Sequence, residues 1–291
     1  MNCSICGSVA HKQRNFPNTQ NTQYKCMNED CPEKYFTVAS NLIRESANIL
    51  LFDIETSPLV GYFWRPWKQN IHMEQLIQDW FMLTWSAKWL NDSKVMGEKL
   101  TKEEVLSCDD SRIIKKLWNL FDKADIILAH HGKAFDIPKS NQRFIINKLK
   151  SPSPYQIIDT RIMAKKIGDF TYNKLDYLAK IFGSEGKLKT DFSLWANCMK
   201  GDTKALSYML EYNKKDVIEM EKVYTILRGY AKGHPNLNMY NVGSVCSVCQ
   251  STNLQQKGEY VMNVTKELTY VCGDCGNYSR QGKKMLKNIA R

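Results

Sequence analysis

The chain has 291 residues, of which 43% are hydrophobic and 24% charged, and this balance excludes wholesale disorder. Its longest apolar stretches are far shorter than the roughly 20 residues of a membrane span, and its first residues predict no secretory signal. Forty-one Lys and Arg against thirty Asp and Glu give a formal net charge of +11, which favours a polyanionic partner, nucleic acid before an acidic membrane surface.

The first cysteine cluster contains four of the ten cysteines, Cys3, Cys6, Cys26 and Cys31. In a chain without an export signal, clustered cysteines are metal ligands or thiols before they are disulfides. A Cys-x2-Cys pair followed by a Cys-x4-Cys pair predicts a zinc ribbon over residues 1–47 with one structural Zn²⁺. His11 is an alternative ligand, although we expect it in an exposed loop.

The main core is predicted over residues 48–234. Asn48–Glu55 is apolar until its acidic end, which is typical of a buried central strand whose end reaches a site. Further strands are predicted at Leu59–Trp64, Phe81–Trp89, Lys94–Lys99, Ile126–His130 and Gln156–Asp159. Apolar periodicity and capping residues predict helices at Asp109–Lys123, Ile137–Leu149, Asn173–Phe182 and Thr203–Gly229, the last in one or two pieces. This order predicts an α/β fold with a mixed sheet flanked by helices.

A second cysteine cluster follows a linker at His234–Asn236 and contains Cys246, Cys249, Cys272 and Cys275. Two Cys-x2-Cys pairs separated by 22 residues predict a tetrahedral structural zinc site in a ribbon over residues 235–291. Gly273 and Gly276 suit the tight turns of such a site. Redox-active cysteine pairs are the alternative, but the flanking sequence has no thioredoxin-like βαβ pattern.

Other cysteines and charges have simpler interpretations. Cys108 and Cys198 are expected to be ordinary, partly buried thiols. Arg280–Arg291 has five bases and no acid, which favours a phosphate-binding tail over a merely solvated one. The ribbons are predicted to clamp nucleic acid, to bind protein or to stabilise the fold.

Carboxylates from three separated segments are the candidate catalytic residues. Asp53 and Glu55 are two residues apart on one strand, so they point to the same side and repel unless a cation neutralises them. Asp136 follows the next buried strand, and Asp216 lies one helical turn after Tyr212. Oxygen ligands suit two Mg²⁺ or Mn²⁺ ions, which activate a water and stabilise the leaving oxygen of a phosphodiester. Because a phenol is a poor base at neutral pH, Tyr212 is suited to orienting that water.

Each of these pieces alone has an ordinary structural explanation: strand-end acids by chance, an N-cap, or a solvated helix face. Together and in order, three motifs resemble those of the DnaQ-like DEDD 3′–5′ exonucleases of the ribonuclease-H-like superfamily. The motifs are Phe52-Asp53-Ile54-Glu55-Thr56, His130-His131-Gly132-Lys133-Ala134-Phe135-Asp136 and Tyr212-Asn213-Lys214-Lys215-Asp216. The resemblance covers about residues 48–228 and is closest to a phage and bacterial subgroup with flanking zinc-binding cysteines.

The resemblance implies residue roles. Two divalent ions would be bound by Asp53, Glu55, Asp136 and Asp216. Tyr212 matches the tyrosine (DEDDy) branch, since the histidine branch would need a His where this chain has Glu211. His131 departs from the usual Asn of the second motif and is expected to make only a polar contact. Asp159 either lies near the metal ions or caps the following helix.

The resemblance also implies an activity: metal-dependent 3′–5′ hydrolysis of DNA, single-stranded DNA preferred, with release of 5′-mononucleotides. An RNA or structured substrate is an alternative for the same site. An inactive zinc-ribbon adaptor that binds nucleic acid is a further alternative, which the four acids and Tyr212 disfavour. We expect a cytoplasmic protein of a bacterial or phage-infected cell, acting in replication, repair or recombination, with a protein of those processes as a candidate partner.

Four aromatic residues surround one arginine in Tyr62-Phe63-Trp64-Arg65-Pro66-Trp67, shortly after the first motif. Aromatic side chains offer stacking platforms for unpaired bases, so this run is a candidate contact for the terminal nucleotide. An aromatic edge strand that packs on a helix is the alternative. Trp80, Trp85 and Trp89 are expected to be core or sheet-face residues.

Overall fold

The computed structural model describes residue 3 and residues 6–15, 21–32, 34–39, 46–65, 67–68, 70–184, 190–240 and 245–285. The chain divides into two compact units. A core unit contains Asn48–Pro235 and Cys275–Asn277, and a terminal unit contains Met1–Ala47, Asn236–Asp274 and Tyr278–Arg291. Among the described helices, none is long and apolar enough to span a bilayer. The end of the basic stretch Arg280–Arg291 lies outside the described residues.

A five-stranded sheet forms the centre of the core unit, in the order β10-β9-β4-β7-β8. Its strands are β4 (Ile49–Thr56), β7 (Met82–Trp89), β8 (Met96–Lys99), β9 (Ile126–Ala129) and β10 (Gln156–Asp159). β4 pairs antiparallel with β7 and parallel with β9, and β9 pairs parallel with β10. The predicted mixed sheet is therefore confirmed, with the apolar first strand at its centre.

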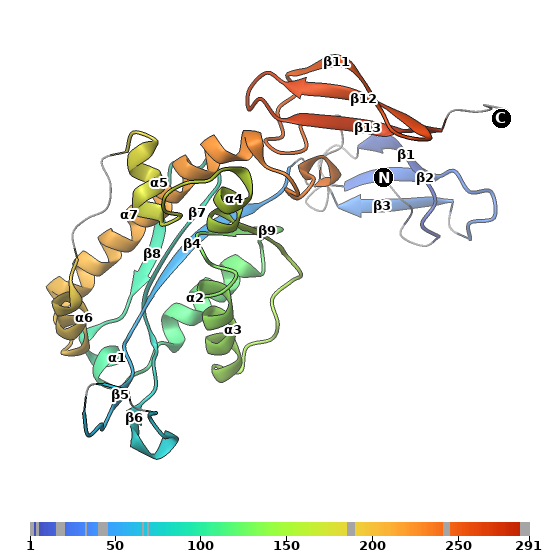
Figure 1. Cartoon of the computed structure of the whole chain (residues 1–291). Helices are drawn as coiled ribbons and strands as arrows, with labels where there is room; N and C mark the ends of the chain where they lie inside the picture. The colour runs from blue at the N-terminus through green and yellow to red at the C-terminus, as the bar shows by residue number, and fades with distance from the viewer. Residues whose placement is uncertain are drawn as a thin grey trace. The chain divides into compact units, whose positions relative to one another are not determined.

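Helices cover both faces of this sheet. They are α1 (Lys102–Leu106), α2 (Ser111–Phe121), α3 (Asp136–Ile146), α4 (Thr160–Ile167), α5 (Leu175–Ile181), α6 (Phe192–Met199) and α7 (Thr203–Leu227). Figure 1 shows α7 along one face, with α2 and α3 across the other. On the second face, the ring of Phe121 lies 4.8 Å from that of Phe52 and 5.2 Å from that of Phe144. These edge-to-face contacts join β4 to both helices.

Four predicted helices are present as α2, α3, α5 and α7, with ends shifted by a few residues, and α7 is continuous. The prediction of a strand at Leu59–Trp64 is wrong for residues 62–64, which are not in a strand. Only β5 (Val60–Gly61) pairs, with β6 (Leu76–Gln78), after the short helix η2 (Met73–Gln75). Beyond this pair, the N–H of Tyr62 still donates to the carbonyl of Gln75 at 2.9 Å, and Phe63 and Trp64 then continue in a loop.

The terminal unit contains two small antiparallel sheets. The first consists of β1 (Ala10–Asn15), β2 (Asn21–Cys26) and β3 (Tyr35–Ala39), and the second of β11 (Leu254–Val261), β12 (Thr265–Cys272) and β13 (Tyr278–Met285). Among the described residues, the buried cluster of the first sheet consists of Cys3, Ala10, Tyr24, Cys26, Cys31 and Phe36. So small an apolar core needs a further stabilising element, such as a metal ion.

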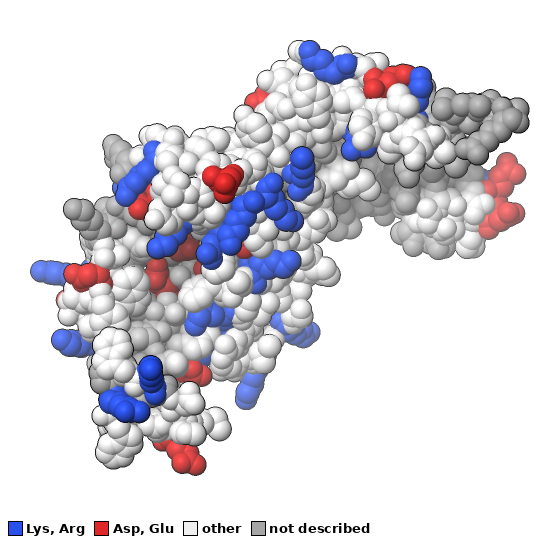
Figure 2. All heavy atoms as spheres, in the orientation of Figure 1, with Lys and Arg blue, Asp and Glu red and all other residues white. Residues whose placement is uncertain are grey.

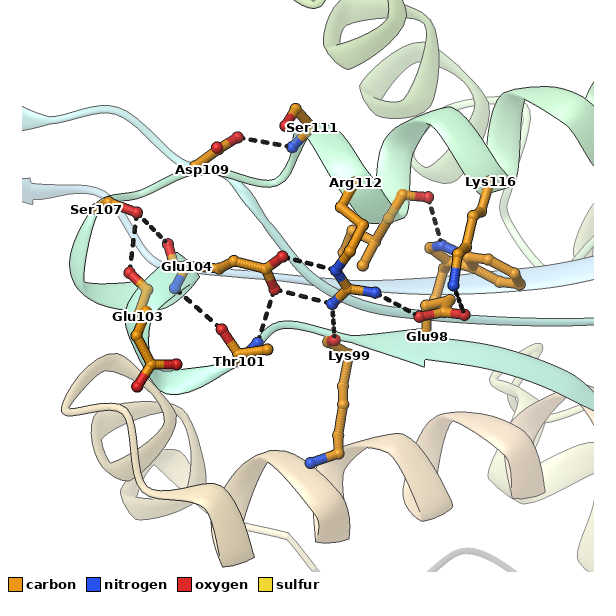
Figure 3. Close-up of polar contacts among 12 residues, drawn as sticks. Glu98, Lys99, Thr101, Glu103, Glu104, Ser107, Asp109, Ser111, Arg112 and Lys116 are labelled. Carbon is orange, nitrogen blue, oxygen red and sulfur yellow. Dashed lines mark hydrogen bonds and ion pairs between the residues drawn. The ribbon is translucent and has the colours of Figure 1, made fainter.

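A polar network around Arg112 connects α1, β8 and α2 (Figure 3). The guanidinium donates to Glu104 at 2.6 and 2.8 Å, to Glu98 at 2.7 Å and to the carbonyl of Lys99 at 2.8 Å. Glu104 also forms a capping box with Thr101 at the start of α1. The hydrogen bond from Arg112 lowers the pKa of Glu104, which favours the ionised pair.

A buried ion pair holds α3 against the start of α2. Asp110, 1% exposed, accepts hydrogen bonds from Arg143 Nε at 2.7 Å and Nη2 at 2.6 Å. The same carboxylate accepts from the backbone N–H of Met82 at 2.9 Å, at the start of β7. One carboxylate therefore links two helices and a strand.

Removal of this carboxylate should destabilise the core strongly. We expect Asp110→Ala to lower the free energy of unfolding by about 3–5 kcal/mol, because it leaves the guanidinium of Arg143 buried and unpaired. The matched control is Asp176→Ala, which removes an exposed pair with Lys180 and should cost less than about 1 kcal/mol. Urea unfolding followed by tryptophan fluorescence measures both values, and equal losses would contradict the assigned role of Asp110.

Candidate functional site

Three carboxylates converge between β4 and α7. Oxygen atoms of Asp53, Glu55 and Asp216 all lie within 4.8 Å of one another. The alternation of a strand places Asp53 and Glu55 on the same face of β4, and α7 packs against this strand and brings Asp216. The structure thus brings together three of the four acids that the sequence singled out.

An asparagine that the sequence interpretation overlooked connects these two elements. Asn213, fully buried on α7, donates from Nδ2 to Asp53 Oδ2 at 2.6 Å. It lies three residues before Asp216, so both side chains project from neighbouring positions on the helix surface. The bond fixes the carboxylate of Asp53 in orientation.

Two buried hydroxyls lie opposite the acid pair. In the β4–β7 ladder, Asp53 faces Ser86 and Glu55 faces Thr84, so each hydroxyl residue points to the same side as its acid. Ser86 and Thr84 are both 0% exposed, and neither hydroxyl oxygen has a hydrogen-bond partner among the described residues. Buried polar atoms normally have partners. Their position beside clustered carboxylates fits a site that takes ions and ordered water.

Asp136 lies at the start of α3, outside the group of three. Its Oδ1 accepts from the backbone N–H of Ile54 at 3.3 Å. β4 pairs with β9 only as far as Leu51, so the N–H of Ile54 lies beyond the paired part of β4. Burial raises the pKa of Asp136 to about 7. A cation held beside it would favour the ionised form.

The turn from β9 to α3 is held tightly by Asp159. This side chain caps α4 by accepting from the N–H groups of Arg161 and Ile162, and it also accepts from His131 and Lys133 in the turn. A Cβ at Gly132 would lie 2.2 Å from that of Ala129, so only glycine fits there. Asp159 is therefore a helix cap that also positions the turn leading to Asp136.

The histidines of this turn have different surroundings. His130 contacts the hydroxyl of Thr160 at 2.8 Å and the carbonyl of Asn173 at 3.0 Å, so its ring is used to join segments of the fold. His131 is exposed and adopts a left-handed backbone, with φ of 69°. Its backbone N–H, rather than its ring, makes the polar contact with Asp159.

Tyr212 lies on α7 one turn before Asp216 and is 9% exposed. Positions four residues apart share a helix face, so the phenol lies on the side of α7 that carries Asp216. By contrast, Glu211 is exposed and pairs with Lys214 at 2.9 Å. The buried tyrosine and the exposed glutamate thus occupy opposite environments on adjacent positions.

The aromatic run after β5 is exposed. Trp64, Trp67 and Tyr62 are 96%, 78% and 74% exposed. The alternative interpretation, packing of these rings on a helix, is therefore wrong. Trp80 and Trp85 are buried as predicted, and Trp85 donates to the carbonyl of Ile113 at 2.8 Å.

The four N-terminal cysteines surround a common point. Sγ atoms of Cys3, Cys6, Cys26 and Cys31 all lie within 4.8 Å of one another, with separations of 3.8 Å for Cys3–Cys31 and 3.5 Å for Cys6–Cys26. Ligands at about 2.3 Å around a tetrahedral zinc are about 3.8 Å apart. Hydrogen bonds from Ser8 lower the pKa of the Cys6 thiol to about 6. His11 lies exposed on β1, outside this group.

The C-terminal cysteines form an equivalent tetrad, with Cys246, Cys249, Cys272 and Cys275 inside the same 4.8 Å limit. Its first turn repeats that of the N-terminal tetrad. The N–H of Cys246 donates to the carbonyl of Ser251, as Cys3 does to Ser8. The residue after each Cys-x2-Cys pair has a left-handed backbone, with φ of 73° at Gly7, 65° at Gln250 and 72° at Gly276. Both tetrads suit zinc.

The two remaining cysteines lie outside these groups. Cys198 is fully buried, and burial raises the pKa of its thiol to about 12. Cys108 is partly buried, as predicted, with a left-handed backbone φ of 55°.

Part of the core unit matches a known family model. Residues 92–228 match the model of a family described as the RNase_H superfamily, a span that includes Asp136 and α7 but not β4. No curated protein matches the chain. A solved structure of the family B DNA polymerase from the hyperthermophilic archaeon Pyrobaculum calidifontis aligns with a TM-score of 0.48 and 11% identity, over 88% of this chain and 35% of that chain.

The sheet order, the helices on both faces and the family match define a ribonuclease-H-like fold. This fold, with clustered carboxylates beside a buried strand end, favours a nuclease-type hydrolase.

Metal content tests the two cysteine tetrads. We expect elemental mass spectrometry to find close to two equivalents of zinc per chain, because each tetrad offers four cysteine sulfur ligands for one tetrahedral ion. Cys249→Ser should lower the content to about one equivalent. Cys108→Ser is the matched control and should leave it at two, and a native content near zero would contradict both sites.

Proposed function

We propose that this protein is a metal-dependent 3′–5′ exonuclease that hydrolyses DNA, prefers single strands and releases 5′-mononucleotides. The observation that supports the proposal best is the convergence of Asp53, Glu55 and Asp216 within 4.8 Å in a ribonuclease-H-like fold. Carboxylates gathered this closely repel one another unless cations lie between them. The resemblance of all three motifs to those of the DEDDy exonucleases is what suggests the 3′–5′ direction and DNA as the substrate.

Mg²⁺ or Mn²⁺ would be held by Asp53, Glu55, Asp136 and Asp216. When bound, such ions supply positive charge to the scissile phosphodiester and acidify a water molecule. The chain's own contribution is to fix the ligands: Asn213 orients Asp53, and the Ile54 N–H orients Asp136. Preorganised ligands avoid rearrangement during the reaction.

Tyr212 is assigned the role of orienting the attacking water. A phenol donates and accepts hydrogen bonds but does not remove a proton readily at neutral pH. Tyr212 is buried and shares a face of α7 with Asp216, a position that supports this role. Tyr212→Phe should therefore reduce turnover while leaving divalent-ion binding intact.

RNA, or an internally cut junction, is the second candidate substrate for the same site. An inactive adaptor is the third candidate, and it is less well supported because a binding-only fold needs no clustered acids. By resemblance, the proposed setting is the cytoplasm of a bacterial or phage-infected cell, where proofreading, repair or recombination, and degradation of foreign DNA are the candidate processes.

Digestion of a 5′-labelled single strand tests the activity. With Mg²⁺, the native protein should produce a ladder that shortens from the 3′ end, and Asp216→Asn should lower the rate by roughly 10²-fold or more through loss of a metal ligand. Glu211→Gln is the matched control on the same helix and should retain the native rate.

The outcomes separate the candidates. Cleavage of circular single strands would contradict an exonuclease, and faster digestion of an RNA of the same sequence would reassign the substrate. Equal rates for the native protein and Asp216→Asn would contradict catalysis at these acids.

The exposed aromatic run is proposed to stack on unpaired bases. Trp64→Ala should weaken binding of a single-stranded oligonucleotide roughly 5- to 150-fold, the effect of losing about 1–3 kcal/mol of stacking. Fluorescence anisotropy on the Asp216→Asn background measures this without hydrolysis. Trp64→Tyr should retain most of the affinity, and Met73→Ala, which removes a similarly exposed apolar side chain nearby, should have no effect. Equal effects of Trp64→Ala and Met73→Ala would contradict stacking.

A further inference from the structure

A cavity of about 240 Å³ lies in the core unit beside the turn that leads to Asp136. At about 30 Å³ per water molecule, it has room for about eight waters. Its walls come from three separate segments: the β9–α3 turn, β10 with α4, and the chain after α7. None of the roles assigned above to the carboxylates, the aromatic run or the cysteines uses this space.

Three lysines line the cavity, one from each segment: Lys133, Lys166 and Lys232. Among the described residues, none of them forms an ion pair with a carboxylate. Figure 2 shows Lys and Arg side chains gathered over α4 and its surroundings, beside a recess in which acidic side chains are visible. Three like charges around one cavity repel one another, so the arrangement favours an anion.

The other polar groups of the cavity do not neutralise the lysines. Asp159, its one acid, already accepts from backbone N–H groups with both oxygens. His234 contacts the Tyr224 hydroxyl through Nε2 at 2.9 Å and the Pro235 carbonyl through Nδ1 at 2.7 Å. Burial lowers the pKa of His234, so it is neutral at pH 7 and adds no charge. The positive charge of the cavity therefore comes from the lysines.

The remaining wall is apolar and consists of Ile157, Ile158, Ile162, Met163, Ile167 and Pro235. A wall of this kind suits a sugar and a base, as the lysines suit a phosphate. We propose that the cavity binds one nucleotide unit of the substrate strand, with its phosphate at Lys133, Lys166 and Lys232. The proposal rests on the proposed function, since it assigns a strand-holding site to that nuclease.

Helix electrostatics alone does not account for the arrangement. Lys165 and Lys166 both lie in the last turn of α4, where bases stabilise the helix dipole. Only Lys166 lines the cavity, and Lys133 and Lys232 lie on non-helical segments. Lys165 is thus a matched control, because it has the same charge, helix and exposure but lies outside the cavity.

Binding of a fluorescein-labelled oligo-dT, measured by anisotropy on the Asp216→Asn background with EDTA, tests the proposal. Lys166→Ala combined with Lys232→Ala should raise Kd roughly tenfold at 0.1 M salt and reduce the slope of log K against log salt by about 1.4. The paired Arg substitutions should restore most of the affinity. Lys165→Ala should change neither quantity.

Each outcome decides the assignment. Equal effects of Lys165→Ala and Lys166→Ala would overturn it in favour of diffuse surface charge. A free deoxynucleoside monophosphate that binds as tightly as the strand, and is lost in the same variants, would overturn the strand assignment in favour of a mononucleotide site. Because binding is measured without hydrolysis, failure of the exonuclease activity and failure of this site are distinguishable.

Discussion

Repulsion between carboxylates at the end of a buried strand is the constraint around which the core unit is arranged. Ionised groups at about 4 Å in a partly buried setting repel by several kcal/mol unless a cation or donor offsets the charge. The chain supplies two neutral donors, Asn213 to Asp53 and the Ile54 N–H to Asp136. Both orient an acid without adding a positive charge, so space for cations is preserved.

The same constraint explains the lengths of the strands. The pairing of β4 with β9 ends at Leu51, whereas β4 continues to pair with β7 as far as Thr56. The stagger opens one side of β4 at the level of its acids, and the turn after β9 fills that opening with Asp136. Asp159 then holds the turn from the end of β10. The parallel strands β4, β9 and β10 thus contribute to one site, because each strand ends close to a residue that builds or holds it.

Much of this core could be predicted from the sequence, because its elements are long or strongly patterned. The apolar run of β4 and the periodic helix α7 are obvious from residue type, and their acids could be named by position. The short helices α1 and α6 were not predicted, and α4 was expected only as an unbounded helix after Asp159, since five to eight residues show little periodicity. Asn213 and Ser86 were overlooked for a different reason. Their importance comes from partners 160 residues away or across a strand ladder, which residue type alone does not reveal.

A net charge of +11 and a site made of acids are complementary parts of one electrostatic design. An uncompensated acidic cluster repels a polyanion, and a surface made only of bases holds it without chemistry. Cations at the carboxylates would invert the local charge, but screening limits this effect to about 8 Å at physiological ionic strength. Further along a strand, the phosphates need fixed positive groups that do not compete with the metal ligands. Lysines on separate segments, with the neighbouring Asp159 already engaged by backbone amides, meet that requirement without forming internal ion pairs.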